Sequence, residues 1–170
     1  MIRLIGAVLL AGGASALGFG AVRGLDRRVS VLDQLMAGLD TVRRELEWRM
    51  TPLPELMKKA SDCTADRVAD FFRLCSVGAM QLNGRSFSSV WSMALEAAGL
   101  ELEAEDLSSV ERLGSVLGRY DSKQQCTALD EALIGLRGQR AAAREQRDRL
   151  GKVYGALGLT AGAFFVILLI

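Results

Sequence analysis

The sequence predicts an all-α protein, in which a helical bundle is inserted between an N-terminal and a C-terminal transmembrane helix. Half of the 170 residues are hydrophobic and 24% are charged, and the two kinds are segregated, with uncharged stretches at both ends. The only two prolines, Pro52 and Pro54, stand at one junction, and long stretches without proline favour helices. Leu, Ala, Glu, Arg and Gln dominate the middle of the chain, as helices prefer.

The two ends of the chain each carry one uncharged segment, Leu4–Val22 and Val153–Ile170. Each is close to the roughly 20 apolar residues that span the hydrocarbon core of a bilayer. We therefore expect transmembrane helices at 1–23 and 152–170, with a helical domain at 24–151 between them.

Both segments are rich in small residues, which allow the backbones of membrane helices to approach closely. The small residues recur every three or four positions, so each set lies on one helix face. We interpret these faces as helix-packing surfaces, although small residues are also simply frequent in such segments. The residues are Gly12, Ala16 and Gly20 in the first segment and Gly151, Gly155, Gly158 and Gly162 in the second.

Positive charges predict the orientation of the chain in the membrane. Three arginines follow the first segment and four basic residues precede the second, whereas only Arg3 lies on the other side. The positive-inside rule therefore places the central domain in the cytoplasm and both termini outside. A cleaved signal peptide is the alternative for the first segment, because Ala14-Ser15-Ala16 resembles a cleavage site. The apolar run continues past that site to Val22, which favours the membrane helix.

Between the two segments, apolar residues at helical spacing predict helices that share one core. The first helix continues from the N-terminal segment to Met50, and the last runs from the cap residue Asp121 into the C-terminal segment. Thr51 is the expected N-cap of the second helix, and Asn83-Gly84 is an expected turn. The intervening helices are expected at Pro52–Ala60, at Thr64–Leu82, from Ser86 or Ser88 to Gly99, and from Glu103 to about Gly118.

The core is predicted from the apolar stripes of these helices. Trp91 and Trp48 are also expected in the core, because large aromatic side chains dominate helix packing. The stripes comprise Leu25, Val29, Leu32, Leu35, Met36, Leu39, Val42, Leu46 and Met50; Val68, Phe71, Phe72, Cys75 and Leu82; Val90, Ala94 and Leu95; Leu107, Val110, Leu113 and Leu117; and Cys126, Leu129, Leu133 and Leu136.

Residues that usually carry catalysis are scarce. The chain has no histidine, the commonest general base and metal ligand. Its three cysteines, Cys63, Cys75 and Cys126, are widely spaced and form no CxxC pair, so a zinc site is not expected. No phosphate-binding loop is present, and the net charge of +1 gives no general attraction to nucleic acid. We expect no enzymatic activity, no metal, no cofactor and no small-molecule substrate.

Two charged clusters have more than one interpretation. Glu101, Glu103, Glu105 and Asp106 could bind a divalent ion, but acidic residues at a helix start are favoured by the helix dipole alone. Arginines spaced by three and four residues form one face of the last helix. This face is either a docking surface for an acidic partner or lipid headgroups or a solvated helix face. The arginines are Arg137, Arg140, Arg144 and Arg147.

The order and spacing of several short motifs resemble the stage III sporulation protein AB family over essentially the whole chain. The sequence departs from that family at Trp48, where the family usually has tyrosine, and matches it only loosely at Arg23–Arg28 and Gly135–Arg144. The motifs are Arg3-Leu4-Ile5-Gly6; Glu45-Leu46 followed by Thr51-Pro52-Leu53-Pro54-Glu55; Trp91; Leu113-Gly114 and Leu117-Gly118 with Asp121 and Gln125; and Lys152-Val153-Tyr154 with Leu157-Gly158.

The resemblance implies a role in sporulation. It implies that the central domain is a bundle similar to the F domain of the type II secretion platform protein. It also implies a protein of the mother-cell membrane around the forespore, where it would anchor the sporulation ATPase of the same complex and contact other stage III channel proteins. The chain could also form homo-oligomers. An alternative drawn from the residues alone is a membrane-bound adaptor or sensor that binds anionic lipid through the arginine face.

Overall fold

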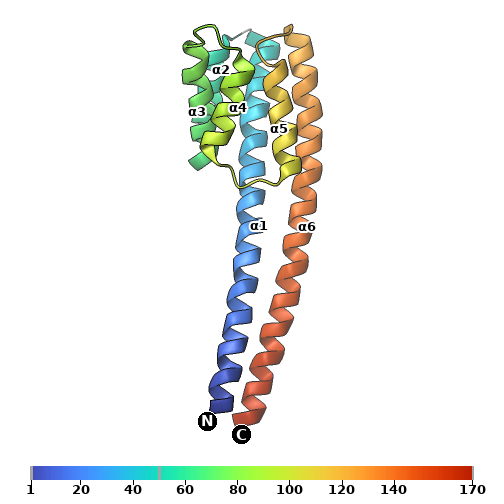
Figure 1. Ribbon diagram of the computed structural model, residues 1–170. Helices are drawn as coiled ribbons and strands as arrows, with labels where there is room; N and C mark the ends of the chain where they lie inside the picture. Colours follow the sequence, from blue (N-terminus) through green and yellow to red (C-terminus); the bar gives the residue numbers. More distant parts are fainter. Residues whose placement is uncertain (1, 50, 170) are drawn as a thin grey trace. The chain divides into compact units, whose positions relative to one another are not determined.

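The computed structural model describes the backbone of residues 2–49 and 51–169 and the side chains of residues 23–49, 51–154 and 156. This part of the chain is all-α, as the sequence predicted, and contains no strand (Figure 1). The six helices are α1 (Ile2–Arg49), α2 (Leu53–Asp62), α3 (Asp66–Met80), α4 (Phe87–Ala98), α5 (Ala104–Val116) and α6 (Ser122–Leu169).

Polar side chains and glycine define several helix ends where the sequence placed them. The backbone N–H of Ser89 donates to the Ser86 hydroxyl at 3.3 Å, so Ser86 caps α4. Gly99 ends α4 in the left-handed conformation, with φ 54°, which glycine adopts without a Cβ penalty. The N–H of Gln124 donates to the Asp121 carboxylate at 2.8 Å at the start of α6. Asn83 and Gly84 both have positive φ and form the expected turn between α3 and α4.

The expected cap at Thr51 was wrong. Pro52 occupies the N-cap position of α2, and no side chain caps that helix. The Thr51 hydroxyl donates instead to the Glu45 carboxylate at 2.9 Å, which also accepts from Lys59 at 2.7 Å. Hydrogen bonds from Lys59 and then from Thr51 lower the pKa of Glu45. The end of α1 is therefore tied to α2 by an ionic contact.

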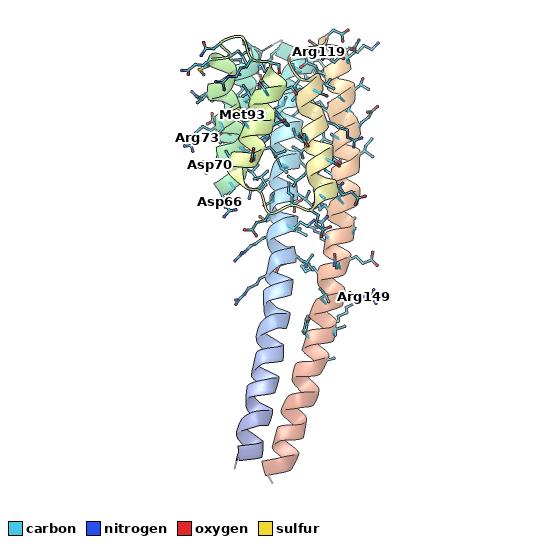
Figure 2. All side chains as sticks on the ribbon, viewed as in Figure 1. Asp66, Asp70, Arg73, Met93, Arg119 and Arg149 are labelled. Carbon is cyan, nitrogen blue, oxygen red and sulfur yellow. The ribbon has the colours of Figure 1, made fainter. Side chains whose placement is uncertain are left out.

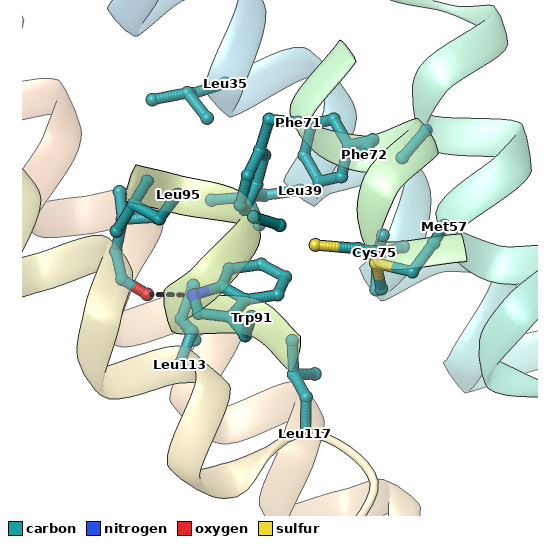
Figure 3. Close-up of a cluster of buried hydrophobic side chains, with 14 of the residues drawn as sticks. Leu35, Leu39, Met57, Phe71, Phe72, Cys75, Trp91, Leu95, Leu113 and Leu117 are labelled. Atoms are coloured by element: carbon teal, nitrogen blue, oxygen red, sulfur yellow. Dashed lines mark hydrogen bonds between the residues drawn. The ribbon is translucent and has the colours of Figure 1, made fainter. Parts of the chain in front are cut away.

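The apolar stripes meet in one core. Trp91 of α4 lies at its centre, packs edge-on against Phe71 with ring centroids 4.8 Å apart, and donates its indole N–H to the Val110 carbonyl at 2.9 Å (Figure 3). Leu39 and Leu113 lie close to the same cluster (Figure 3). Most of the predicted core residues are buried, but five are only half-buried, and Met50 lies outside the described residues. The half-buried five are Leu25, Met36, Leu82, Leu107 and Cys126.

The chain divides into two compact units, one formed by Ser30–Arg140 and the other by the parts of α1 and α6 outside that range. Within the first unit, α2 packs on α3, α3 on α4 and α4 on α5. The Arg43 guanidinium of α1 contacts the Asp130 carboxylate of α6 at 2.5 Å. In the second unit, Arg147 of α6 contacts Asp26 of α1 at 3.3 Å.

The predicted transmembrane segments fall almost entirely on residues whose side chains are outside the described part of the chain. Among the residues that were described, no helix is both long enough and apolar enough to cross a membrane. The helical backbone of α1 includes Leu4–Val22, and that of α6 includes Val153–Leu169.

Candidate interaction surfaces

The arginine face of α6 is partly engaged in ion pairs within each unit. In the unit Ser30–Arg140, Arg140 pairs with Asp33 of α1, while the Arg137 side chain is exposed. These two arginines therefore differ in role: Arg140 connects two helices, and Arg137 faces solvent.

In the other unit, Arg147 contacts Asp148 at 2.8 Å and Asp26 at 3.3 Å. The hydrogen bond to Asp148, followed by that to Asp26, raises the pKa of Arg147. Arg144 is exposed. Arg140 and Arg147 are thus engaged by aspartates of the same chain, which lowers the positive charge that the face offers to an anionic partner.

The predicted packing stripes fall mainly outside the described side chains. Gly12, Ala16, Gly20, Gly155, Gly158 and Gly162 all lie there, and their packing stays a prediction. Gly151 is described and exposed, and a Cβ added to it would meet no atom within 4 Å in this chain.

The acidic cluster forms a helix start. Glu103 and Asp106 form a capping box at the beginning of α5, in which the Glu103 backbone N–H donates to the Asp106 carboxylate at 3.1 Å. This arrangement satisfies donors that every helix N-terminus leaves open. Across the described residues, no group of three or more potential ligand side chains is placed to hold a metal ion.

The three cysteines lie in different environments. Cys75 is fully buried, and burial raises the pKa of its thiol. Cys126 is half-buried, and burial likewise raises its pKa. Cys63 is exposed at the end of α2. A raised pKa disfavours the reactive thiolate, so neither Cys75 nor Cys126 has the surroundings of a nucleophile.

Trp48 is not a core residue, contrary to the expectation from its size. Its side chain is 79% exposed in the last turn of α1. The reason is helical phase, because Trp48 follows the buried Leu46 by two positions, about 200° around the helix. Leu39, Val42 and Leu46 already fill the inward face of α1.

An apolar groove between α3 and α4, here called the α3–α4 groove, was missed from the sequence. It has a volume of about 330 Å³. Val77 is 52% exposed, Met80 beside it 64% and Met93 56%, and Met93 projects outward from α4 (Figure 2). The lining residues are Leu74, Val77, Gly78 and Gln81 of α3 and its C-terminus, Asn83 and Arg85 of the turn, and Val90, Met93, Ala94 and Ala97 of α4.

The sequence did carry a signal for this groove. In α3, Phe71, Phe72 and Cys75 face the core, but Leu74 and Val77 place a second apolar stripe on the outer face. A helix that is apolar on two faces needs a second partner surface. Asp66, Asp70 and Arg73 mark the polar remainder of that outer face (Figure 2).

Comparisons with known proteins agree on one family of similar proteins. The family model described as stage III sporulation protein AB matches residues 3–170. The stage III sporulation protein AB of Bacillus subtilis (strain 168) is 25% identical over 171 residues, which cover 99% of each chain. A solved structure of a stage III sporulation protein AB (SpoIIIAB) is similar with a TM-score of 0.66 at 22% identity, over 72% of this chain and 98% of that one. This last likeness shows the fold.

Proposed function

The chain belongs to the stage III sporulation protein AB family, and from that premise we propose that it is a membrane platform of a sporulation complex. It would stand in the mother-cell membrane around the forespore and anchor the ATPase of the same complex on the cytoplasmic side. Its helical unit would act as the F domain does in a type II secretion platform, through protein contacts with the ATPase and other stage III channel proteins. It would have no catalytic activity of its own.

The observation that carries this proposal is the construction of α1 and α6. Each is one helix that contributes apolar residues to the core of the unit Ser30–Arg140 and also includes the described residues of one of the two uncharged terminal segments. A helix that is part of both a folded domain and an apolar terminal segment can fix the domain at a bilayer surface. The absence of histidine from the sequence also favours a structural role over a catalytic one.

The direct test is capture of the sporulation ATPase by the purified full-length chain in detergent, with and without ATP. We expect the chain to retain the ATPase. Ile134→Asp changes an exposed side chain on α6 and serves as a folded control variant. Failure of the folded full-length chain to retain the ATPase in either nucleotide state would contradict the anchoring role.

The lipid-adaptor alternative is favoured by one observation, the exposure of Arg137 and Arg144 on α6. It predicts that the full-length chain reconstituted in vesicles binds added anionic lipid headgroups less well after Arg144→Gln, at low salt. The matched control is Arg149→Gln, which removes another exposed positive charge from outside the arginine face. Equal binding by the two variants would remove lipid recognition by this face.

A further inference from the structure

The α3–α4 groove exposes apolar side chains to solvent. Its walls carry exposed apolar side chains from two helices, and Val77 and Met93 are each more than half exposed. Isolated exposed apolar residues are normal on a protein surface, but a contiguous apolar groove marks a place where another surface binds. Elsewhere in the described chain, the large exposed apolar side chains Trp48, Tyr120, Ile134 and Val153 lie on other elements and do not line this groove.

The charge at the groove is positive and lies at one end. Arg85 is the only charged residue among those that line it. Its guanidinium contacts the Met93 sulfur at 3.9 Å, and no described carboxylate lies within ion-pair distance of it. At this end of the groove the partial positive N-terminus of α4 lies near the partial negative C-terminus of α3, so the helix ends largely cancel and Arg85 supplies the positive charge. One end of the groove therefore attracts a negative group, and the rest is apolar.

The dimensions select the kind of occupant. On α3 and its C-cap the lining extends from Leu74 to Gln81 and on α4 from Val90 to Ala97, eight residues in each case. At 1.5 Å per residue this is about 10 Å, or two helical turns. A groove of this length between two helices matches the mode in which a short amphipathic helix inserts apolar anchors at positions i, i+3, i+4 and i+7.

We propose that the α3–α4 groove binds an amphipathic helix of a partner protein, with apolar anchors over two turns followed by a carboxylate that pairs with Arg85. The inference rests on the proposed function, in which the chain binds other proteins of its complex. It adds that one of these partners presents an amphipathic helix to this groove. A second copy of this chain fits less well. Two grooves facing each other would bring together two Arg85 side chains and supply no carboxylate among the residues that line them.

The test uses the full-length chain in detergent and two synthetic helical peptides. Both peptides carry leucine at i, i+3, i+4 and i+7, and they differ in ending with glutamate or with lysine one turn further on. Binding is measured by fluorescence anisotropy. We expect the glutamate peptide to bind about tenfold more tightly than the lysine peptide, as charge-assisted contacts do. Arg85→Glu should reverse this order, and a charge swap of that kind is not produced by general loss of folding.

Two further variants separate the groove from the rest of the surface. Val77→Asp should weaken the glutamate peptide by at least about tenfold, because a carboxylate enters the apolar lining. Ile134→Asp introduces an aspartate at an exposed apolar site on α6, outside the groove, and should leave binding unchanged. Equal binding of the two peptides, or equal effects of the two aspartate variants, would overturn the proposal. A dimer of the full-length chain would also overturn the proposal if Val77→Asp dissociates it and the peptide does not. In that case the groove would bind a second copy of the chain.

The ATPase capture described above is measured on the same variants. If the peptides do not bind but the ATPase is retained, the groove inference is wrong and the platform role stands. If the peptides bind with the expected charge dependence but the ATPase is not retained, the groove is a binding site and the anchoring of the ATPase is wrong.

Discussion

At the scale of single residues, glycines allow neighbouring helices to approach closely. A Cβ on Gly38 would collide with the Phe72 ring, one on Gly78 with Val90, and one on Gly114 with Trp91. Each glycine thus accepts a large side chain from a neighbouring helix, and interiors packed to crystal-like density leave no room for an added methyl group. The Leu113-Gly114 motif noted in the sequence has its physical basis here.

The first prediction compares two glycines inside helices. Gly114→Ala should destabilise the fold by about 1–3 kcal/mol, because the new methyl group overlaps the indole of Trp91 and overpacked cores cost that much. Gly135→Ala on α6 is the matched control, since its Cβ would meet no atom within 4 Å. It should stabilise by up to about 1 kcal/mol through helix propensity.

Thermal unfolding followed by circular dichroism measures both variants against the wild type. The expected order of midpoints is Gly135→Ala at or above the wild type and Gly114→Ala clearly below it. A Gly114→Ala midpoint equal to that of the wild type would mean that Trp91 does not occupy this position in solution.

At the scale of helices, ionic contacts hold α1 against the elements on either side of it. Glu45 accepts from Lys59 of α2 at 2.7 Å, and Arg43 contacts Asp130 of α6 at 2.5 Å. The contact with Asp130 raises the pKa of Arg43. Both pairs are partly open to solvent, so screening limits their energy. Their role is to fix how α1 is rotated relative to its neighbours.

The second prediction concerns pH. Because the pKa of Glu45 in the folded chain is lowered by Lys59 and Thr51, its ionised form stabilises the fold above the ordinary value of about 4.3. This contribution is lost as the pH falls through the lowered pKa. Glu45→Gln should therefore lower the thermal midpoint at pH 7, and the difference from the wild type should shrink below about pH 4.

The control is Glu96→Gln, which changes an exposed carboxylate on α4 and should have little effect at either pH. The midpoints are measured from pH 3 to pH 7. A Glu45→Gln effect that is as large in acid as at neutral pH would show that the variant acts through packing and not through its charge.

The helices and their ends were largely predictable because local chemistry determines them. Ser86, Gly99 and Asp121 act as caps through contacts within a few residues, and the apolar stripe of α1 follows from periodicity alone. Trp48 was misplaced because residue size was given more weight than helical phase. The α3–α4 groove was missed because the sequence analysis placed Val90 and Ala94 in the core and assigned Leu74, Val77 and Met93 to no surface. Only the arrangement of the helices in space brings these residues together.

At the scale of the whole molecule, the proposed platform depends on which side of a membrane the helical unit occupies. The chain provides its own reporter, because Cys63 is exposed whereas Cys75 is fully buried. With the half-buried Cys126 changed to serine, Cys63 becomes the one readily accessible thiol among the described side chains.

The third prediction applies to non-sporulating cells that express the Cys126→Ser chain, in which no engulfed forespore is present and the membrane that holds the chain faces the medium. A membrane-impermeant maleimide should label Cys63 only after the cells are permeabilised, because the positive-inside rule places the domain in the cytoplasm. A chain with the further changes Cys63→Ser and Arg3→Cys should be labelled in intact cells, since the N-terminus is expected outside. Labelling of Cys63 in intact cells would reverse the topology.

The contact between Arg43 and Asp130 joins residues separated by 87 positions. During synthesis, Arg43 therefore exists for some time before its partner has been added to the chain. At about 5–20 residues per second, the ribosome takes about 4–17 s to add the residues between them. During that interval α1 and its apolar face exist without α6. The core of the bundle therefore closes only late in translation, after α2 to α5 have been made, and a truncated chain that stops before α6 would leave that face open to chaperones and proteases.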